Sequence, residues 1–307
     1  MNDDSKTSPP EKVIFPEKPE QNTCEQWLNV PTGDFHYLDI CDGHYRNIKN
    51  GSATYLRKIV SRMVEKKLVE AVGSRDGIYR VVEDTAKPVD WRNYKQGGDS
   101  GVVLPFGLQK YCVLPTDSLM TVGGSKSSGK TGFLLRTCGL NIHGERDVVL
   151  LSNLEGGIGM LRDRLFVMDI DIPEDAKFSV LNVYENYHDY IKKPNTLYVI
   201  DYIDVPDGEG FYKIGYLIKK IAIKLIGLNS VAVVGLQKPS TRDIPLGGEQ
   251  TIKSSMISLA IDKNKLKIID CKVSAKPHEN PNNMAWTFDY DNSGTNFTNI
   301  KQKYGNE

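Results

Sequence analysis

Apolar residues recur along the chain with two different spacings, and each spacing predicts a different kind of element. In residues 52–68 they return every three or four positions, which places them on one face of a helix: Leu56, Ile59, Val60, Met63 and Val64. Residues 68–83 contain two short β-prone runs around Asp76 and Gly77, a pair typical of a tight turn. The pattern therefore predicts a helix followed by a hairpin.

In the second half of the chain the apolar residues form short continuous runs. The runs are rich in β-branched residues: SLMTVG, DVVLLSN, FSVLNV, TLYVIDY, SVAVVGL, MISLAI and KLKIIDCKV. Helix-like stretches separate the early runs, at about residues 130–142, 156–168 and 212–228. Strands that are apolar on both faces and alternate with helices predict a buried, mostly parallel sheet with flanking helices. The last runs follow one another without helices, which predicts antiparallel strands at one edge.

Polar stretches set the expected domain boundaries. Residues 1–30 are rich in proline and carboxylates and have few apolar anchors, so they are expected to form a disordered acidic tail. A second polar stretch, residues 84–101, marks an expected linker at 85–107. The predicted domains are then a small domain at 31–84 and an α/β domain at 108–300, with a short tail at 301–307.

Composition changes this picture in a few places. The formal net charge is zero, so the overall balance points to neither nucleic acid nor membrane. Locally, residues 1–43 hold three lysines against nine carboxylates, whereas residues 44–82 hold nine Lys/Arg against three carboxylates. The five cysteines are scattered without metal-ligand spacing, which favours reduced thiols in the cytoplasm. No secretory leader and no apolar run long enough for a membrane span is expected.

The stretch GSKSSGKT, residues 124–131, fits the P-loop pattern, in which a glycine-rich loop joins a strand to a helix. Its backbone N–H groups and the following helix N-terminus suit phosphate oxygens. Lys130 is expected to reach the β- and γ-phosphates, and the Thr131 hydroxyl to ligate Mg²⁺. The pattern predicts ATP and Mg²⁺ as ligands, with these nucleotide-binding residues: Gly124, Ser125, Lys126, Ser127, Ser128, Gly129, Lys130, Thr131 and Gly132.

Two acidic residues lie where a P-loop protein needs them. Asp201 ends the apolar run TLYVID, as a metal-facing Walker B carboxylate does. Asp204 lies close by and is an alternative, and a simple turn aspartate is the other interpretation. Glu155 follows the run VVLLSN and is a candidate base for the attacking water, unless it is an ordinary surface glutamate.

The order and spacing of four segments resemble the motifs of RecA-like ATPases of the DnaB-type replicative helicase group. The segments are GGSKSSGKT, VVLLSNLEGGIGMLRDRL, LYVIDYIDV and VAVVGLQKPS, and the resemblance covers about residues 108–297. It implies a RecA-like fold with Glu155 as the base and Asp201 as the metal carboxylate. It also implies that Gln237 is the sensor that couples the γ-phosphate to DNA-binding loops, and that copies assemble into a ring or filament.

In that family a neighbouring subunit supplies a cation to the γ-phosphate, usually an arginine beside a lysine. The matching segment here, KLKIIDCKVSAKP, offers Lys272 and Lys276 but no arginine. An arginine finger is worth several powers of ten in rate, and a lysine lacks its planar fork. This departure favours a weak or slowly switching ATPase over a fast motor.

Residues 33–83 resemble a winged helix-turn-helix, whose basic helix would enter a DNA groove. The expected duplex contacts are Arg57, Lys58 and Arg62 on the helix, and Arg75 on the wing. Many winged helices bind protein instead, so an adaptor domain stays open. The polar stretch 238–255 contains Arg242 and is a candidate loop for single-stranded DNA, or else a plain surface loop.

Together these features predict an ATP-binding and ATP-hydrolysing DNA-associated protein, homo-oligomeric, cytoplasmic and without membrane association. Its expected role is in DNA replication or recombination, helicase-like or loader-like, in a phage or mobile element. Two alternatives remain: an ATP-switched DNA-binding regulator with slow hydrolysis, and a scaffold that binds nucleotide only for assembly. Stimulation of hydrolysis by single-stranded DNA distinguishes the motor from both.

Overall fold

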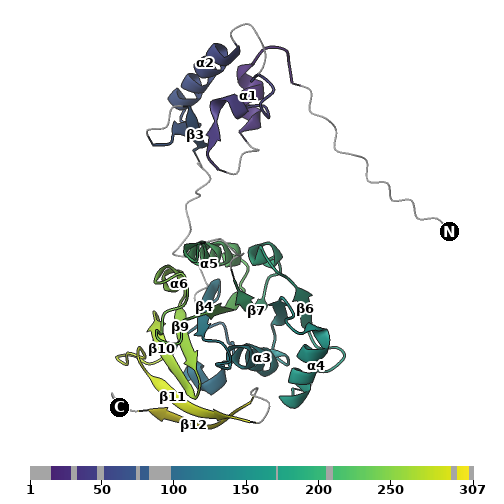
Figure 1. Ribbon diagram of the computed structural model, residues 1–307, viewed down its shortest axis with the longest axis vertical. Helices are drawn as coiled ribbons and strands as arrows, with labels where there is room; N and C mark the ends of the chain where they lie inside the picture. The colour runs from purple at the N-terminus through teal and green to yellow at the C-terminus, as the bar shows by residue number, and fades with distance from the viewer. Residues whose placement is uncertain are drawn as a thin grey trace, which may run out of the picture. The chain divides into compact units, whose positions relative to one another are not determined.

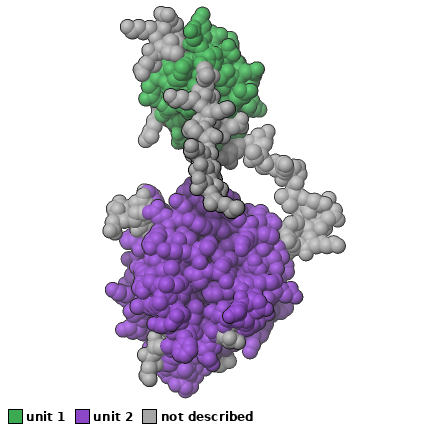
Figure 2. All heavy atoms as spheres, turned by 90° about the vertical axis from the view of Figure 1, so that its right-hand side faces the viewer, with its two compact units in different colours: residues 1–92 green, residues 93–307 purple. Residues whose placement is uncertain are grey.

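The computed structural model describes residues 15–28, 33–46, 52–73, 77–82, 98–170, 172–204, 210–291 and 296–303. The chain divides into two compact units, Met1–Arg92 and Asn93–Glu307, which Figure 2 colours separately. Several sequence-based predictions fall outside the described residues: those for residues 1–14 of the tail, for Arg75, and for residues 85–97 of the linker.

The first unit combines two helices with a small sheet. Its elements are α1 (Gln21–Trp27), β1 (Phe35–His36), the 3-10 helix η1 (Tyr37–Asp39), α2 (Ser52–Glu65), β2 (Val69–Ala71) and β3 (Ile78–Val81). The three strands pair antiparallel in the order β1-β3-β2. The predicted helix and hairpin are thus present as α2 and the β2–β3 pair, and β1 closes the outer edge of β3.

The apolar face of α2 forms the centre of this unit. Leu56, Ile59, Val60 and Met63 are buried against α1 and the sheet. Val64 was expected on the same face, but its side chain is 41% exposed. At 3.6 residues per turn, Val64 lies at the edge of the stripe, where the packed elements no longer cover it.

The predicted tail is wrong for its last third, because Gln21–Trp27 forms α1. Cys24 and Trp27 are buried in the core of the first unit, and the Trp27 indole N–H donates to the Asp42 carboxylate at 3.0 Å. The apolar residues of this segment are few, but helical spacing puts them on one side. The average composition of residues 1–30, which is mostly polar, does not show that spacing.

The second unit is built on one nine-stranded sheet, with strand order β12-β11-β10-β9-β4-β8-β7-β5-β6. The parallel strands are β4 (Ser118–Gly124), β5 (Asp147–Ser152), β6 (Phe178–Asn182), β7 (Thr196–Ile203), β8 (Val231–Gln237) and β9 (Ile257–Asp262). The antiparallel strands at one edge are β10 (Lys265–Cys271), β11 (Ala285–Tyr290) and β12 (Phe297–Lys303). Both the mostly parallel sheet and the antiparallel edge that the sequence predicts are confirmed. β12 continues to Lys303, three residues into the predicted C-terminal tail.

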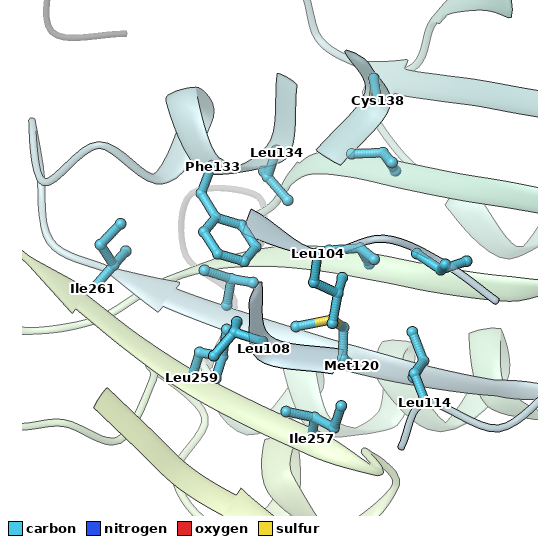
Figure 3. Close-up of a cluster of buried hydrophobic side chains, with 14 of the residues drawn as sticks. Leu104, Leu108, Leu114, Met120, Phe133, Leu134, Cys138, Ile257, Leu259 and Ile261 are labelled. Carbon is cyan, nitrogen blue, oxygen red and sulfur yellow. The ribbon is translucent and has the colours of Figure 1, made fainter. Parts of the chain in front are cut away.

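Helices cover both faces of this sheet, as predicted (Figure 1). α3 (Lys130–Asn141) and α4 (Gly157–Val167) pack on one face, and α5 (Tyr212–Leu225) packs on the other. The remaining helical turns are η2 (Pro105–Lys110), η3 (Tyr187–Tyr190) and α6 (Gln250–Lys253). Figure 3 shows the larger core, where Phe133 and Leu134 of α3 lie over the strands that carry Met120 and Leu259.

The predicted linker 85–107 is wrong at its C-terminal end, since residues 98–107 belong to the second unit. Val102 and Leu104 are buried in the core of the α3 face, and Figure 3 shows Leu104 among the core side chains. The Asn141 side chain makes two hydrogen bonds to the Val103 backbone. Its Oδ1 accepts from the Val103 N–H at 2.9 Å, and its Nδ2 donates to the Val103 carbonyl at 2.8 Å. These bonds tie the apolar end of the predicted linker to helix α3. Within the described stretches, no helix has the length and apolar run that crossing a bilayer requires.

Candidate nucleotide-binding site

The site lies where the central parallel strands end. β4 runs into the 124–131 loop, and Gly124 is paired with Gln237 at the end of β8. β7 contributes Asp201, and β5 leads into the turn that carries Glu155. Because the carboxyl ends of parallel strands meet at one edge of a sheet, this arrangement brings the four predicted segments together.

The backbone of the 124–131 loop requires glycine at two positions. Gly129 has φ +92°, and a Cβ there would come within 1.7 Å of the Tyr290 hydroxyl. A Cβ on Gly124 would come within 2.6 Å of the Ser128 Oγ. Helix α3 begins directly afterwards at Lys130, so its free N–H groups and positive end face the loop. The strand, loop and helix predicted for a P-loop are therefore all present.

Lys130 is buried, with 8% of its surface exposed. Its Nζ lies 3.7 Å from the centre of the Tyr202 ring, a cation–π contact. Burial lowers the pKa of Lys130 to about 8, while the carboxylates of Asp201, Glu155 and Asp204 act to raise it. The lysine is thus held beside several negative groups in a position open to a phosphate.

Asp201 is the buried acid of the site. Burial raises its pKa, and the Lys130 charge and a hydrogen bond from the Thr131 hydroxyl counteract that rise. One carboxylate oxygen, Oδ1, is buried and has no hydrogen-bond partner among the described residues. A carboxylate oxygen without a partner next to a threonine hydroxyl is the kind of oxygen pair that Mg²⁺ uses, together with water and phosphate oxygens. The residues present therefore fit the predicted metal.

Tyr202, which the sequence did not single out, connects the remaining groups. Its hydroxyl donates to Glu155 Oε1 at 3.2 Å and also hydrogen-bonds the Gln237 side chain. Burial and the Glu155 carboxylate raise the pKa of Tyr202 to about 12, whereas the bond from Gln237 lowers it. Glu155 itself is exposed at the rim of the site. The base and the sensor implied by the resemblance thus share one hydroxyl group.

All of these groups except Asp201 line one cavity of about 750 Å³, a volume in the range of ligand sites. Its lining contains the whole predicted loop from Gly124 to Gly132, together with Glu155, Arg164, Tyr202, Gln237 and Tyr290. A smaller hollow of about 40 Å³ adjoins it between Thr131, Asp201 and Glu155, with room for water. Asp204 is exposed and does not line either hollow, so Asp201 is the better placed carboxylate.

Arg164 and Tyr290 also line the cavity and were missed by the sequence reasoning. Arg164 projects from α4, and its charge lowers the pKa of Asp201. It lies within the motif segment that contains Glu155, so the spacing along α4 was a usable signal. Tyr290 comes from β11, and its hydroxyl donates to the Ser128 carbonyl. No local pattern could reveal Tyr290, because its position depends on pairings across β10, β9 and β4.

An ion pair between a buried lysine and a partly exposed aspartate is hydrogen-bonded to the loop. Lys238 follows Gln237, and its side chain is 0% exposed. Its Nζ lies 2.8 Å from Asp262 Oδ1 and also donates to the Arg242 carbonyl at 2.9 Å. Asp262 accepts a second bond, at 3.3 Å, from the Ser125 hydroxyl of the loop. Lys238 therefore cannot be a DNA contact of the 238–255 stretch, whereas Arg242 is exposed.

The predicted trans-acting lysines, Lys272 and Lys276, lie at the opposite end of the sheet from the 124–131 loop of the same chain. β10 is antiparallel to β9, so Cys271 pairs with Ile257 at the start of β9, far from Gly124 at the end of β4. Lys272 follows Cys271 and donates to the Lys253 carbonyl at 2.5 Å. Lys276 lies 3.2 Å from Glu279. Both lysines are exposed, and a role at a γ-phosphate requires a second copy of the chain.

The candidate DNA-contacting residues of the first unit lie on the exposed side of α2. Arg57 stacks on Tyr37, 5.2 Å from the ring centre, and donates to its hydroxyl at 3.1 Å. Lys58 and Arg62 are exposed. Arg75 lies outside the described residues. α2 thus carries two exposed cations, Lys58 and Arg62, and a third cation, Arg57, that is held against the Tyr37 ring.

Four of the five cysteines form two pairs in space although they are scattered along the chain. All five cysteines are free thiols. Cys24 is hydrogen-bonded to Cys41, and Cys112 is hydrogen-bonded to Cys271. Across the described part of the chain, no three His, Cys, Asp or Glu residues gather closely enough to hold a metal ion by themselves. A metal at Asp201 and Thr131 would therefore need oxygens from phosphate and water.

No protein-family model matches the chain. No curated protein matches it in sequence. Among solved structures, an ATPase domain has a TM-score of 0.47 at 15% identity, over 60% of this chain and 85% of that one. A DnaB-like replicative helicase, described with its interactions with primase, has a TM-score of 0.45 at 15% identity, over 60% of this chain. The RadB recombinase has a TM-score of 0.42 at 14% identity, over 62% of this chain and 93% of that one. The match spans 58% of the helicase chain.

Proposed function

We propose that this protein binds and hydrolyses ATP and associates with DNA, as an oligomeric ATPase of the RecA/DnaB-like class in DNA replication or recombination. The observation that carries the proposal is the convergence of five groups on two adjoining hollows: the P-loop, Lys130, Glu155 and Gln237 line the larger one, and Asp201 lines the smaller one with Thr131 and Glu155. Each group has a place in phosphoryl transfer: a cradle for phosphate, a cation, a metal carboxylate, a base and a sensor.

Each of these residues has a separate role in the proposed reaction. Backbone N–H groups of the loop and the start of α3 hold the phosphates, and Lys130 offsets their charge. Glu155 stands at the rim of the cavity, where its carboxylate can accept a proton from a water molecule directed at the γ-phosphate. Asp201 and Thr131 would hold a Mg²⁺ ion, which would supply positive charge to offset that of the phosphates.

ATP hydrolysis by the purified protein, measured without DNA, with duplex and with single strands, tests this proposal. Stimulation by single strands of about tenfold or more, which corresponds to about 1.4 kcal/mol of barrier, supports a DNA motor. Hydrolysis that exceeds the Lys130→Ala blank but does not respond to DNA contradicts the motor and leaves the ATPase. A rate equal to that blank under all three conditions contradicts the ATPase as well.

Glu155→Gln is expected to bind ATP normally and to hydrolyse it about 10²–10⁴-fold more slowly, because a glutamine cannot accept the proton from water. The measurement is single-turnover hydrolysis together with the identity of the nucleotide retained by the protein, which should remain ATP.

Glu145→Gln is the matched control, since Glu145 is an exposed glutamate that precedes β5 at the opposite end of the strand from the site. It should hydrolyse ATP at the wild-type rate. Normal turnover by Glu155→Gln would remove Glu155 from the role of base, and Asp204→Asn would be the next variant to measure.

For the first unit we propose a winged helix-turn-helix that binds duplex DNA. The supporting observations are the order of its elements, the β2–β3 hairpin that follows α2, and the pairing of β1 with β3. The exposed side of α2 carries Arg57, Lys58 and Arg62, while its apolar face is buried in the core. A helix that is anchored on one side and basic on the other suits a DNA groove.

Arg62→Ala is expected to weaken duplex binding and to reduce the slope of log K against log salt by about 0.9, the value for one lost phosphate contact. Fluorescence anisotropy over a salt series gives both quantities. Arg46→Ala is the control, because Arg46 is already paired with Asp39 in the same unit. Unchanged affinity and slope in Arg62→Ala would favour a protein-binding winged helix.

A second candidate function is an ATP-switched DNA-binding protein with slow hydrolysis. It is favoured by the identity of the exposed cations at the far end of β10, which are Lys272 and Lys276 and not an arginine. Lysine gives a point charge without the bidentate fork of arginine, so it stabilises the transferring phosphoryl group less well. The hydrolysis measurement above separates this candidate from the motor.

A further inference from the structure

Strand order places Tyr202 between the two groups that it contacts. β7 lies between β8 and β5 in the sheet. Gln237 is the last residue of β8, and Glu155 follows the end of β5. A side chain at the end of the middle strand is therefore within reach of both neighbours. Tyr202 immediately follows Asp201, to which it is joined by a cis peptide bond, and it lines both hollows of the site.

The two ends of the Tyr202 side chain make different contacts. Its hydroxyl donates to Glu155 Oε1 at 3.2 Å and hydrogen-bonds the Gln237 amide. Its ring lies under the Lys130 ammonium, with 3.7 Å from Nζ to the ring centre. An ammonium over a tyrosine ring is attracted to the ring face, and burial strengthens that attraction. One side chain therefore touches the base, the sensor and the phosphate-binding lysine.

We propose that Tyr202 is a positioning residue for ATP hydrolysis, which sets the Glu155 carboxylate through its hydroxyl and holds Lys130 through its ring. The hydroxyl also joins Gln237 to Glu155, so the end of β8 and the turn after β5 move as one unit. This inference rests on the proposed ATPase function. It assigns separate effects to the two ends of Tyr202: the hydroxyl acts on turnover, and the ring acts on nucleotide binding.

Tyr202→Phe and Tyr202→Leu separate these two effects. Tyr202→Phe keeps the ring and loses the hydroxyl, so kcat should fall about 10- to 100-fold, because a misplaced catalytic group costs about that much. Its Kd for a non-hydrolysable ATP analogue should stay within about twofold, since the aromatic face under Lys130 remains. Tyr202→Leu loses both contacts and should show the same fall in kcat together with weaker binding of the analogue. Circular dichroism melting of each variant reports that the fold is retained.

Tyr198→Phe is the matched control. It removes a hydroxyl from the same strand, but that hydroxyl accepts from the backbone N–H groups of Lys192 and Lys193 before the strand begins. Turnover at saturating ATP should be unchanged. A fall in kcat equal to that of Tyr202→Phe would mean that any lost hydroxyl on β7 slows the enzyme, and it would overturn the inference.

A double-mutant cycle with Gln237→Leu tests the link between sensor and base. If Tyr202 joins them, the double variant loses no more kcat than the more impaired single variant, within about twofold. Losses that multiply would show that the two side chains act separately, which overturns the link. Wild-type turnover in Tyr202→Phe overturns the positioning role and leaves the proposed function standing. Wild-type protein that does not hydrolyse ATP at all overturns the proposed function itself.

Discussion

Lys130→Ala is expected to bind ATP about 30- to 5,000-fold more weakly than the wild type. Truncating one partner of a buried, hydrogen-bonded charge pair costs about 2–5 kcal/mol, which corresponds to that range of affinity. Lys130 is buried at the start of α3, and burial already lowers its pKa to about 8, so little water competes with a phosphate for its ammonium group. Isothermal titration with Mg²⁺ and a non-hydrolysable ATP analogue measures the change.

Lys177→Ala is the control for this variant, because Lys177 is an exposed lysine that precedes β6 at the end of the sheet away from the site. Lys130→Arg tests whether a positive charge at this position is sufficient for ATP binding. Its guanidinium is larger than the ammonium and must fit against the Tyr202 ring, so we expect binding between those of the wild type and Lys130→Ala. Wild-type affinity in Lys130→Ala would contradict the assignment of this loop as the phosphate site.

Asp262→Ala is expected to lower the free energy of unfolding by about 3–5 kcal/mol, the cost of leaving a buried charge without its partner. The Lys238 side chain is fully buried, and Asp262 is its only carboxylate partner among the described residues. Urea denaturation followed by circular dichroism gives the change. The variant also removes the acceptor of the Ser125 hydroxyl, so ATP affinity should fall in the folded fraction.

The Lys267–Asp243 pair provides the comparison, since it lies nearby and is partly exposed on both sides. Asp243→Ala should cost about 0–1 kcal/mol, as partly exposed ion pairs do. Lys238→Met combined with Asp262→Ala should recover most of the lost stability, because a buried pair can be replaced by an apolar side chain of similar length. A loss in Asp262→Ala no greater than that in Asp243→Ala would contradict a structural role for the buried pair.

Much of the candidate nucleotide site follows from the sequence, because its main residues lie at the ends of apolar strands. The glycines and Lys130 form a contiguous pattern, and Asp201 and Gln237 each end a run that only a buried parallel strand explains. Parallel strands bring their carboxyl ends together whatever their exact order. The pattern therefore places these residues at one edge without knowledge of the pairing.

Residues that depend on pairing or side-chain direction were not predictable in the same way. In the sequence, Tyr202 looks like one more residue of the apolar β run. Only the structure at the end of β7 shows that its side chain lines the cavity. Tyr290 reaches the loop through three successive strand pairings that no local pattern specifies. The ion pair of Lys238 with Asp262 likewise joins two strand ends that are separated by β4.

The errors in the N-terminal half have a common physical cause. Each misassigned segment contains a few apolar residues and lies in a longer stretch that is mostly polar. In α1 those few residues face one way and pack around Cys24 and Trp27. In residues 98–107 they alternate, so Val102 and Leu104 enter the core while Val103 stays outside. Spacing, and not the fraction of apolar residues, decided whether each segment folded.

The position of β4 in the sheet has a consequence for synthesis of the chain. Both of its neighbours, β8 (Val231–Gln237) and β9 (Ile257–Asp262), come more than a hundred residues later in the sequence. While a ribosome has released β4 and α3 but not β8, the backbone of the strand that carries the phosphate loop has no sheet partner. The nascent chain therefore completes the proposed ATP site late, and we expect retention on an ATP resin only after translation has passed β9.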